Sequence, residues 1–78
     1  MMTNPELKIL RNERIKAGLS IRKMASHIGI SKSMYAFLEK GKKRLSYDCA
    51  VKIAEVLGKK PDELFIRDYE AFYRKTLI

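Results

Sequence analysis

The segment from Leu19 to Gly41 constrains the fold of this chain more than any other. It contains two short patterns in which apolar residues recur at helical spacing, and a serine precedes each pattern, Ser20 and Ser31. Serine is a favoured N-cap residue, because its side-chain oxygen accepts a hydrogen bond from an otherwise unpaired helix amide. Gly29 stands between the patterns and can adopt the left-handed conformation of a sharp turn. The segment therefore predicts two short helices joined by a tight turn.

The rest of the chain extends this pattern to an all-α fold. Asn4 and Pro5 predict a helix start, with asparagine as N-cap and proline at the first helical position. Apolar spacing and capping residues predict a compact bundle of five short helices, at about residues 5–17, 21–28, 32–40, 46–57 and 61–65. We expect a single domain over residues 1–65, followed by a C-terminal tail over residues 66–78. The apolar spacing of the tail fits a helix, and a strand is the alternative.

Positive charge is concentrated in the same part of the chain. There are 17 Lys and Arg against 9 Asp and Glu, which gives a formal net charge of +8. Seven basic residues and a single acidic one, Glu39, lie between Arg22 and Arg44, so this segment alone is net +6. A basic patch on one element of a small domain suggests that a polyanion docks there. The alternative is an ordinary lysine-rich surface that faces solvent.

Other classes of function lack the residues they need. A single cysteine, Cys49, excludes an internal disulfide, and with a single histidine, His27, it gives no metal site. Paired carboxylates, a Ser/His/Asp set and a glycine-rich phosphate loop are all missing, so we expect no catalytic residue, no enzyme activity and no cofactor. No apolar run approaches the ~20 residues of a membrane span, and no signal peptide is recognisable. The sequence predicts a cytoplasmic protein that binds neither a membrane nor a small-molecule ligand.

A series of short motifs spans about residues 7–65. They are RIKAGLS at residues 14–20, MA at 24–25, GIS at 29–31, LEKG at 38–41, the basic loop at 42–44 and AEVLGKKPDELF at 54–65. Together they resemble the lambda-repressor-like, Cro/C1-type helix-turn-helix family, the XRE-like regulators. The resemblance implies a transcriptional regulator whose third helix enters the DNA major groove. It also implies a homodimer on a palindromic operator, more often as a repressor than as an activator.

The resemblance and the chemistry of the side chains assign two kinds of DNA contact. The positions that match the family's base-contacting residues are Lys32, Ser33, Ala36 and Phe37, with Lys40 at the margin. The residues expected at the sugar-phosphate backbone, which offer a cation or a helix N-terminus, are Ser20, Arg22, Lys23, Ser31, Lys42, Lys43 and Arg44. Lysine can donate to guanine, whereas Ala36 and Phe37 can make only apolar contacts, with thymine methyl groups.

Two positions depart from the family pattern and leave an alternative function open. Ile21 stands where the family often has a glutamine that contacts phosphate, and Phe37 stands where polar base-reading residues are common. Met34 and Phe37 can instead mark an apolar patch for a protein partner. The alternative is therefore a protein-interaction module on the same scaffold, such as an antitoxin or a regulatory partner, with weak or no sequence-specific DNA binding.

Two further expectations concern assembly and stability. Arg14 and Glu39 match positions that form an ion pair in the family, which would join the first predicted helix to the third. A domain of this size is marginally stable by itself, so a homodimer is expected. We place the dimer contact in the tail, at Tyr69, Phe72 and Tyr73. The alternative is that the tail folds back and completes the core of its own chain.

Overall fold

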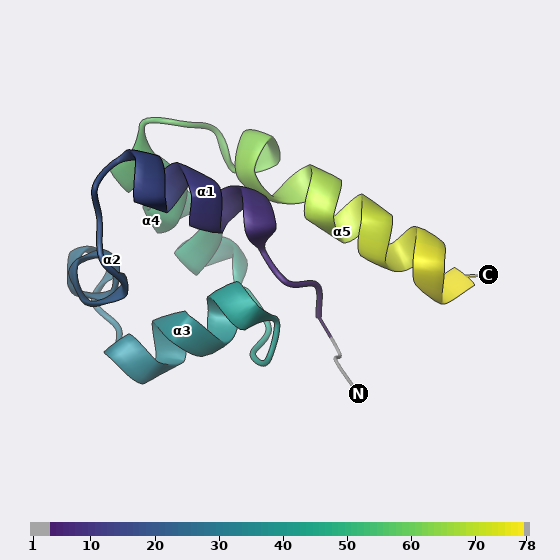
Figure 1. Ribbon diagram of the computed structural model, residues 1–78, viewed down its shortest axis with the longest axis horizontal. Coiled ribbons are helices and arrows are strands. Elements are labelled where there is room, and N and C mark those ends of the chain that lie inside the picture. The colour runs from purple at the N-terminus through teal and green to yellow at the C-terminus, as the bar shows by residue number, and fades with distance from the viewer. Residues whose placement is uncertain (1–3, 78) are drawn as a thin grey trace.

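The computed structural model describes the backbone of residues 4–77 and the side chains of residues 4–69. Five α-helices make up this part of the chain, and it contains no strand: α1 (Lys8–Lys16), α2 (Ile21–Ile28), α3 (Lys32–Lys40), α4 (Tyr47–Leu57) and α5 (Pro61–Leu77). The predicted all-α fold of five helices is confirmed. Helix α2 packs against α3 and α4, while α5 packs against α1 and α4 (Figure 1).

The core lies where these helices meet. The largest side chains that are completely buried are Leu7, Leu10, Met24, Tyr35, Leu38, Ile53 and Leu64. They come from the segment before α1 and from all five helices, so that no helix pair forms the core by itself. Burial of each apolar side chain of this size contributes roughly 1.5–3 kcal/mol. The third helix is thus held from behind by Tyr35 and Leu38, and its other face remains available.

The two helices of the central segment begin and end as the sequence predicted. The Oγ atoms of Ser20 and Ser31 accept hydrogen bonds from the backbone N–H groups of Lys23 and Met34, each at 3.1 Å. Gly29 ends α2 with φ of +77°, in the left-handed region. Both signals act within a single turn, and the packing of the rest of the chain does not override them.

The start of the first helix was predicted wrongly. Asn4 and Pro5 do not cap it: α1 begins at Lys8, and Leu7 occupies the N-cap position without a side-chain hydrogen bond. The backbone N–H of Leu7 instead donates to the carbonyl of Glu39 at 2.9 Å. A contact with the end of α3 therefore fixes this segment and prevails over the local capping signal.

The predicted short helix at residues 61–65 and the predicted helical tail form one continuous helix, α5. Asp68 of α5 accepts a hydrogen bond from the backbone N–H of Ile9 at 3.2 Å, so it caps α1 from the far end of the chain. Tyr69 is partly buried and packs against the core of its own chain. The side chains of Phe72 and Tyr73 lie outside the described residues.

Candidate nucleic-acid interface

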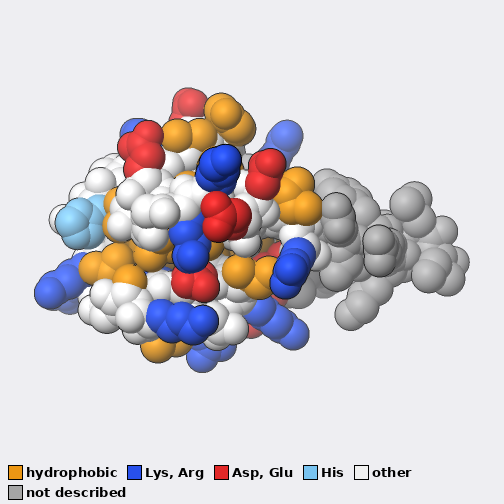
Figure 2. Space-filling model, turned by 90° about the horizontal axis from the view of Figure 1, so that it is seen from above, with side chains coloured by type: hydrophobic (Ala, Val, Ile, Leu, Met, Phe, Trp, Pro, Cys, Tyr) orange, Lys and Arg blue, Asp and Glu red, His pale blue; other side chains and the backbone are white. Residues whose placement is uncertain are grey.

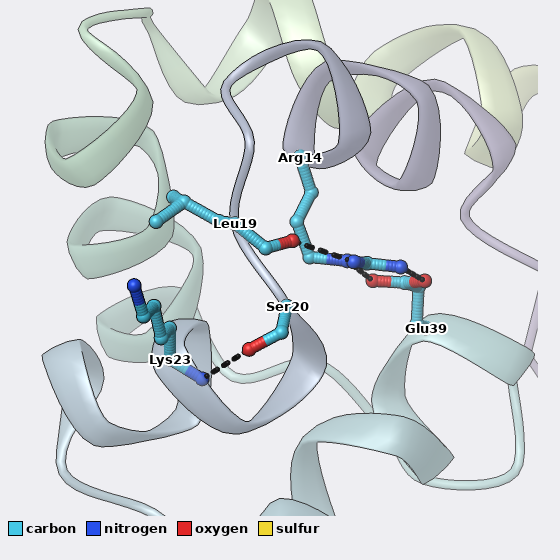
Figure 3. Close-up of polar contacts among 5 residues, drawn as sticks. All are labelled: Arg14, Leu19, Ser20, Lys23 and Glu39. Carbon is cyan, nitrogen blue, oxygen red and sulfur yellow. Dashed lines mark hydrogen bonds and ion pairs between the residues drawn. The ribbon is translucent and has the colours of Figure 1, made fainter.

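A buried ion pair fixes α3 relative to α1. Nε and Nη2 of Arg14 donate to the two carboxylate oxygens of Glu39, each at 2.9 Å, while Nη1 donates to the carbonyl of Leu19 at 2.8 Å (Figure 3). This two-pronged geometry is the strongest form of such a contact. Its hydrogen bonds to the Glu39 carboxylate raise the pKa of the Arg14 guanidinium. Arg14 and Glu39 thus form the ion pair that the resemblance implies, and it also holds the segment leading into α2.

Tyr35 lies against this pair on the inner face of α3. Its side chain is completely buried, and burial together with the negative charge of Glu39 raises the pKa of the phenol. The hydroxyl lies beside Arg14 and Glu39 but outside regular hydrogen-bond geometry with any described residue. Tyr35 therefore fills the core as a neutral ring that supports α3 from behind.

The outer face of α3 carries the predicted base-contacting residues. Lys32, Ser33 and Lys40 are exposed, Phe37 is 42% exposed, and Ala36 is half-buried. Helical spacing explains why they share a face, because residues three and four apart in a helix lie above one another. Their side chains are accessible for contact with a ligand, while Tyr35 and Leu38 anchor the opposite side of the helix.

The exposed charged side chains of α2, α3 and the following loop are all positive. All seven basic side chains between Arg22 and Arg44 are exposed: Arg22, Lys23, Lys32, Lys40, Lys42, Lys43 and Arg44. We call this set the basic face. Glu39 is the only acidic residue between Ile15 and Tyr47, and it is buried against Arg14. The basic face therefore has no exposed carboxylate of its own to neutralise it.

The opposite side of the molecule differs. Figure 2 looks from above onto the side away from α3, and acidic and basic side chains lie next to one another there. Charges of both signs at close range largely cancel at a distance, whereas a surface of one sign attracts ligands of the other sign. A polyanion would therefore be attracted more strongly to the side that carries α3.

The N-termini of both helices, α2 and α3, are also accessible. Ser20 and Ser31 are exposed, and their oxygens are occupied by capping hydrogen bonds. A serine hydroxyl can still donate one hydrogen bond while it accepts another. Helix N-termini carry partial positive charge and are recurrent phosphate sites. The capping role of these serines is therefore compatible with the predicted phosphate contacts.

The position of Lys42 was not foreseen from the sequence. Its ammonium group lies over the ring of Phe37, 6.0 Å from the ring centre, within the range of a cation–π interaction. The chain reverses at Gly41, and the backbone N–H of Lys42 donates to the carbonyl of Phe37 at 2.8 Å. The glycine was the only hint of this reversal in the sequence, and it did not indicate where the lysine side chain points.

Ile21 departs from the family pattern for a visible structural reason. Its side chain is partly buried and packs against the core instead of standing on the surface. This position offers apolar contact to the protein interior and no hydrogen-bond donor to a phosphate. Near α2, the exposed residues that the sequence predicts at phosphates are Ser20, Arg22 and Lys23.

In the described part of the chain, no three or more His, Cys, Asp or Glu side chains come together as a group that could hold a metal ion. None of the helices, as far as they are described, has the length and apolar character needed to cross a membrane.

Comparison with known proteins places the chain among transcriptional regulators. The model of the HTH_3 family, described as helix-turn-helix, matches residues 10–64, which is more than half of the chain. Two uncharacterized HTH-type transcriptional regulators of Archaeoglobus fulgidus are 36% and 33% identical to it over 66 residues. These matches cover 85% of this chain and 94% and 93% of the relatives.

Solved structures agree with this assignment. The restriction-modification controller protein C.AhdI from Aeromonas hydrophila superposes with a TM-score of 0.70 at 33% identity, over 74% of this chain and 88% of that chain. The clp gene regulator ClgR from Corynebacterium glutamicum superposes with a TM-score of 0.78 over 99% of this chain and 82% of its own. Its identity is 19%, so that it supports the fold alone.

Proposed function

The chain belongs to the HTH_3 helix-turn-helix family of transcriptional regulators, and from that premise we propose that it represses transcription by binding a palindromic operator as a homodimer. In this proposal α3 lies in the major groove and its outer face contacts base edges. Phosphate contacts fix the register of the protein on the duplex, and base contacts supply the sequence preference.

One observation carries the proposal: the basic face contains seven exposed cations and no exposed carboxylate. B-form DNA carries a negative charge per phosphate, and neutralising phosphates releases bound counterions, which supplies much of the affinity. The residues proposed at the phosphates are Ser20, Arg22, Lys23, Ser31, Lys42, Lys43 and Arg44. The residues proposed at the bases are Lys32, Ser33, Ala36, Phe37 and Lys40.

A homodimer would give the arrangement that a palindrome requires. Two recognition helices about 34 Å apart reach successive major grooves on one side of the duplex. We place the contact between the two copies in the tail, at Tyr69, Phe72 and Tyr73, beyond a DNA-binding domain of residues 1–65. The partial burial of Tyr69 against its own chain supports the alternative for that residue, in which the start of the tail completes the core. In this proposal the protein acts in the cytoplasm, without catalysis or a cofactor.

The second candidate function is a protein-interaction module that does not read DNA sequence. The 42% exposure of the Phe37 ring and the inward packing of Ile21 favour it. An apolar protein interface and a DNA interface respond differently to salt. Binding to DNA weakens steeply as salt rises, whereas the association of two apolar surfaces does not.

The test starts with selection of bound fragments from random duplex DNA by the full chain. The affinity for the selected duplex and for a scrambled duplex is then measured over a series of salt concentrations. We expect a selected half-site that recurs in inverted orientation and a steep loss of affinity with salt. Failure to bind any duplex in dilute buffer would overturn the proposal. Sedimentation of the free protein and of its complex with the selected duplex measures whether the protein is a dimer and whether two copies bind one duplex.

A further inference from the structure

One large, markedly exposed apolar side chain lies in the segment that carries the basic face. Four large hydrophobic residues among the described side chains are markedly exposed: Ile15, Phe37, Tyr47 and Ile66. Of these, Phe37 is the one that lies on α3, with Lys40 and the basic loop close by in the chain. Its surroundings favour a polyanionic ligand, while its own ring offers no hydrogen-bond donor or acceptor.

The basic loop contacts Phe37 at both its backbone and its ring. The main-chain carbonyl of Phe37 accepts hydrogen bonds from the backbone N–H groups of Lys42 and Lys43, at 2.8 and 3.3 Å. The Lys42 ammonium lies over one face of the ring. Ala36, which is half-buried, adds a methyl group beside it in the helix. Phe37 and Ala36 therefore form a small apolar surface next to the Lys42 cation.

The major groove offers such a surface one complementary group. Base edges there present hydrogen-bond donors and acceptors, except for the methyl group on C5 of thymine. Cytosine that is methylated at C5 carries the same group on the same ring carbon. The two bases differ at the exocyclic oxygen and amine on C4, which an aromatic ring without donors or acceptors does not distinguish by hydrogen bonding.

We propose that Phe37 recognises the C5-methyl group itself, so that the protein binds an operator containing 5-methylcytosine more tightly than the same operator containing cytosine. This inference rests on the proposed function, because it requires α3 to lie in the major groove. Burial of one methyl group corresponds to about fourfold in affinity. Two symmetric half-sites would give about fifteenfold.

The first experiment removes or adds only the methyl group. In the selected duplex each thymine is replaced in turn by uracil, and the affinity of the full chain is measured. We expect about fourfold weaker binding at one position of each half-site. At that position the T·A pair is then replaced by C·G and by 5-methyl-C·G. We expect the methylated duplex to bind about fourfold tighter per half-site than the unmethylated one.

The second experiment assigns the effect to the ring. In Phe37→Ala we expect both methyl effects to disappear, with the salt dependence unchanged, because no cation has been removed. Ile15→Ala is the control, since it removes another exposed hydrophobe, 55% exposed, from α1, and both methyl effects should persist. Circular dichroism of each variant establishes that it folds.

The outcomes separate this inference from the proposed function. If binding depends on salt but the duplexes with thymine and with uracil bind equally well at every position, the inference is overturned and the proposed DNA binding stands. Methyl effects that persist in Phe37→Ala overturn the assignment to this residue. Failure to bind any duplex overturns both, and capture of an apolar peptide at Phe37 in its place would support the protein-interaction module.

Discussion

Glu39 receives two parallel hydrogen bonds from Arg14, each 2.9 Å long, in a place where both side chains are almost inaccessible to water. The pair joins α1 to α3, and it also withdraws the one carboxylate of the central segment from the surface. The same contact therefore holds α3 in position and leaves the basic face without an exposed carboxylate.

Removal of either partner of this pair should strongly destabilise the fold. Arg14→Ala or Glu39→Ala leaves an uncompensated buried charge, which costs about 3–5 kcal/mol. The double replacement Arg14→Met with Glu39→Leu should cost much less, because no charge is left without a partner. The free energy of unfolding in urea, measured for the wild type, the single variants and the double variant, gives these costs. Lys16→Ala is the control: its contact with Glu13 is exposed, and a change within about 0.5 kcal/mol is expected. Equal effects of Arg14→Ala and Lys16→Ala would contradict the buried geometry.

Tyr35→Phe should leave the stability unchanged or raise it by up to about 1 kcal/mol, because the buried hydroxyl forms no regular hydrogen bond with any of the described residues. The pH dependence gives a second readout. Burial raises the pKa of Tyr35 above its ordinary value near 10, so the folded chain retains a proton that the unfolded chain loses. Wild-type stability should therefore fall as pH rises above about 10, and Tyr35→Phe should fall less steeply. Parallel alkaline unfolding curves for the two proteins would contradict this account.

Local signals predicted the central helices because their causes lie within one turn. Ser31 caps the N–H group three residues ahead, and Gly29 adopts the conformation that its own lack of a side chain permits. The start of α1 could not be predicted in this way. It depends on contacts of Leu7 with Glu39 and of Ile9 with Asp68, which are remote in sequence and exist only in the folded chain.

The candidate interface was predictable to the same extent. Helical spacing identified which residues of α3 share the outer face, and the residue types indicated a polyanion. The position of Lys42 over Phe37 follows from a chain reversal at Gly41, where φ is +80°. Sequence periodicity does not encode where a side chain points after such a turn. The contact between Lys42 and Phe37 could therefore be found only in the structure.

Gly41→Ala should destabilise the protein more than Gly29→Ala. Both glycines have positive φ, which costs an alanine about 1–2 kcal/mol. Only at Gly41 would the added Cβ also meet backbone, 2.6 Å from the carbonyl oxygen of Asn4 and 2.7 Å from that of Pro5, whereas Gly29 has open space. We expect a loss of about 3 kcal/mol or more at Gly41 in urea unfolding. Equal losses at the two positions would show that the N-terminal segment does not pass this close to α3.

Asp68→Asn should be at least as stable as the wild type at neutral pH, whereas Asp68→Ala should lose about 1 kcal/mol. Asparagine keeps an acceptor for the N–H of Ile9, and alanine does not. Burial raises the pKa of Asp68, although the Ile9 N–H and nearby Lys8 oppose the shift and Glu6 adds to it. The carboxyl of Asp68 then binds a proton more tightly in the folded chain than in the unfolded chain. Its contribution to the free energy of unfolding therefore falls as pH rises through about 4.

The difference between Asp68→Asn and the wild type should therefore shrink as pH is lowered below that range, where the wild-type carboxyl is protonated. Thermal unfolding of the three proteins at several pH values measures this difference directly. The cap proposed for α1 would be wrong if Asp68→Asn and Asp68→Ala were destabilised alike at neutral pH.

Lys32→Ala and Lys43→Ala should weaken DNA binding in distinguishable ways. Lys32 lies in the first turn of α3, and its loss should cost about 1–3 kcal/mol at one base position and relax the preference there. Lys43 lies in the exposed loop, and its loss should weaken binding to all sequences alike and reduce the salt slope by about one unit. Lys60→Ala, an exposed lysine outside the basic face, should change neither quantity. The measurement is the affinity of each variant for matched operator sequences at several salt concentrations. If Lys32→Ala and Lys43→Ala lost the same affinity on every sequence and at every salt concentration, the division into base and phosphate contacts would be refuted.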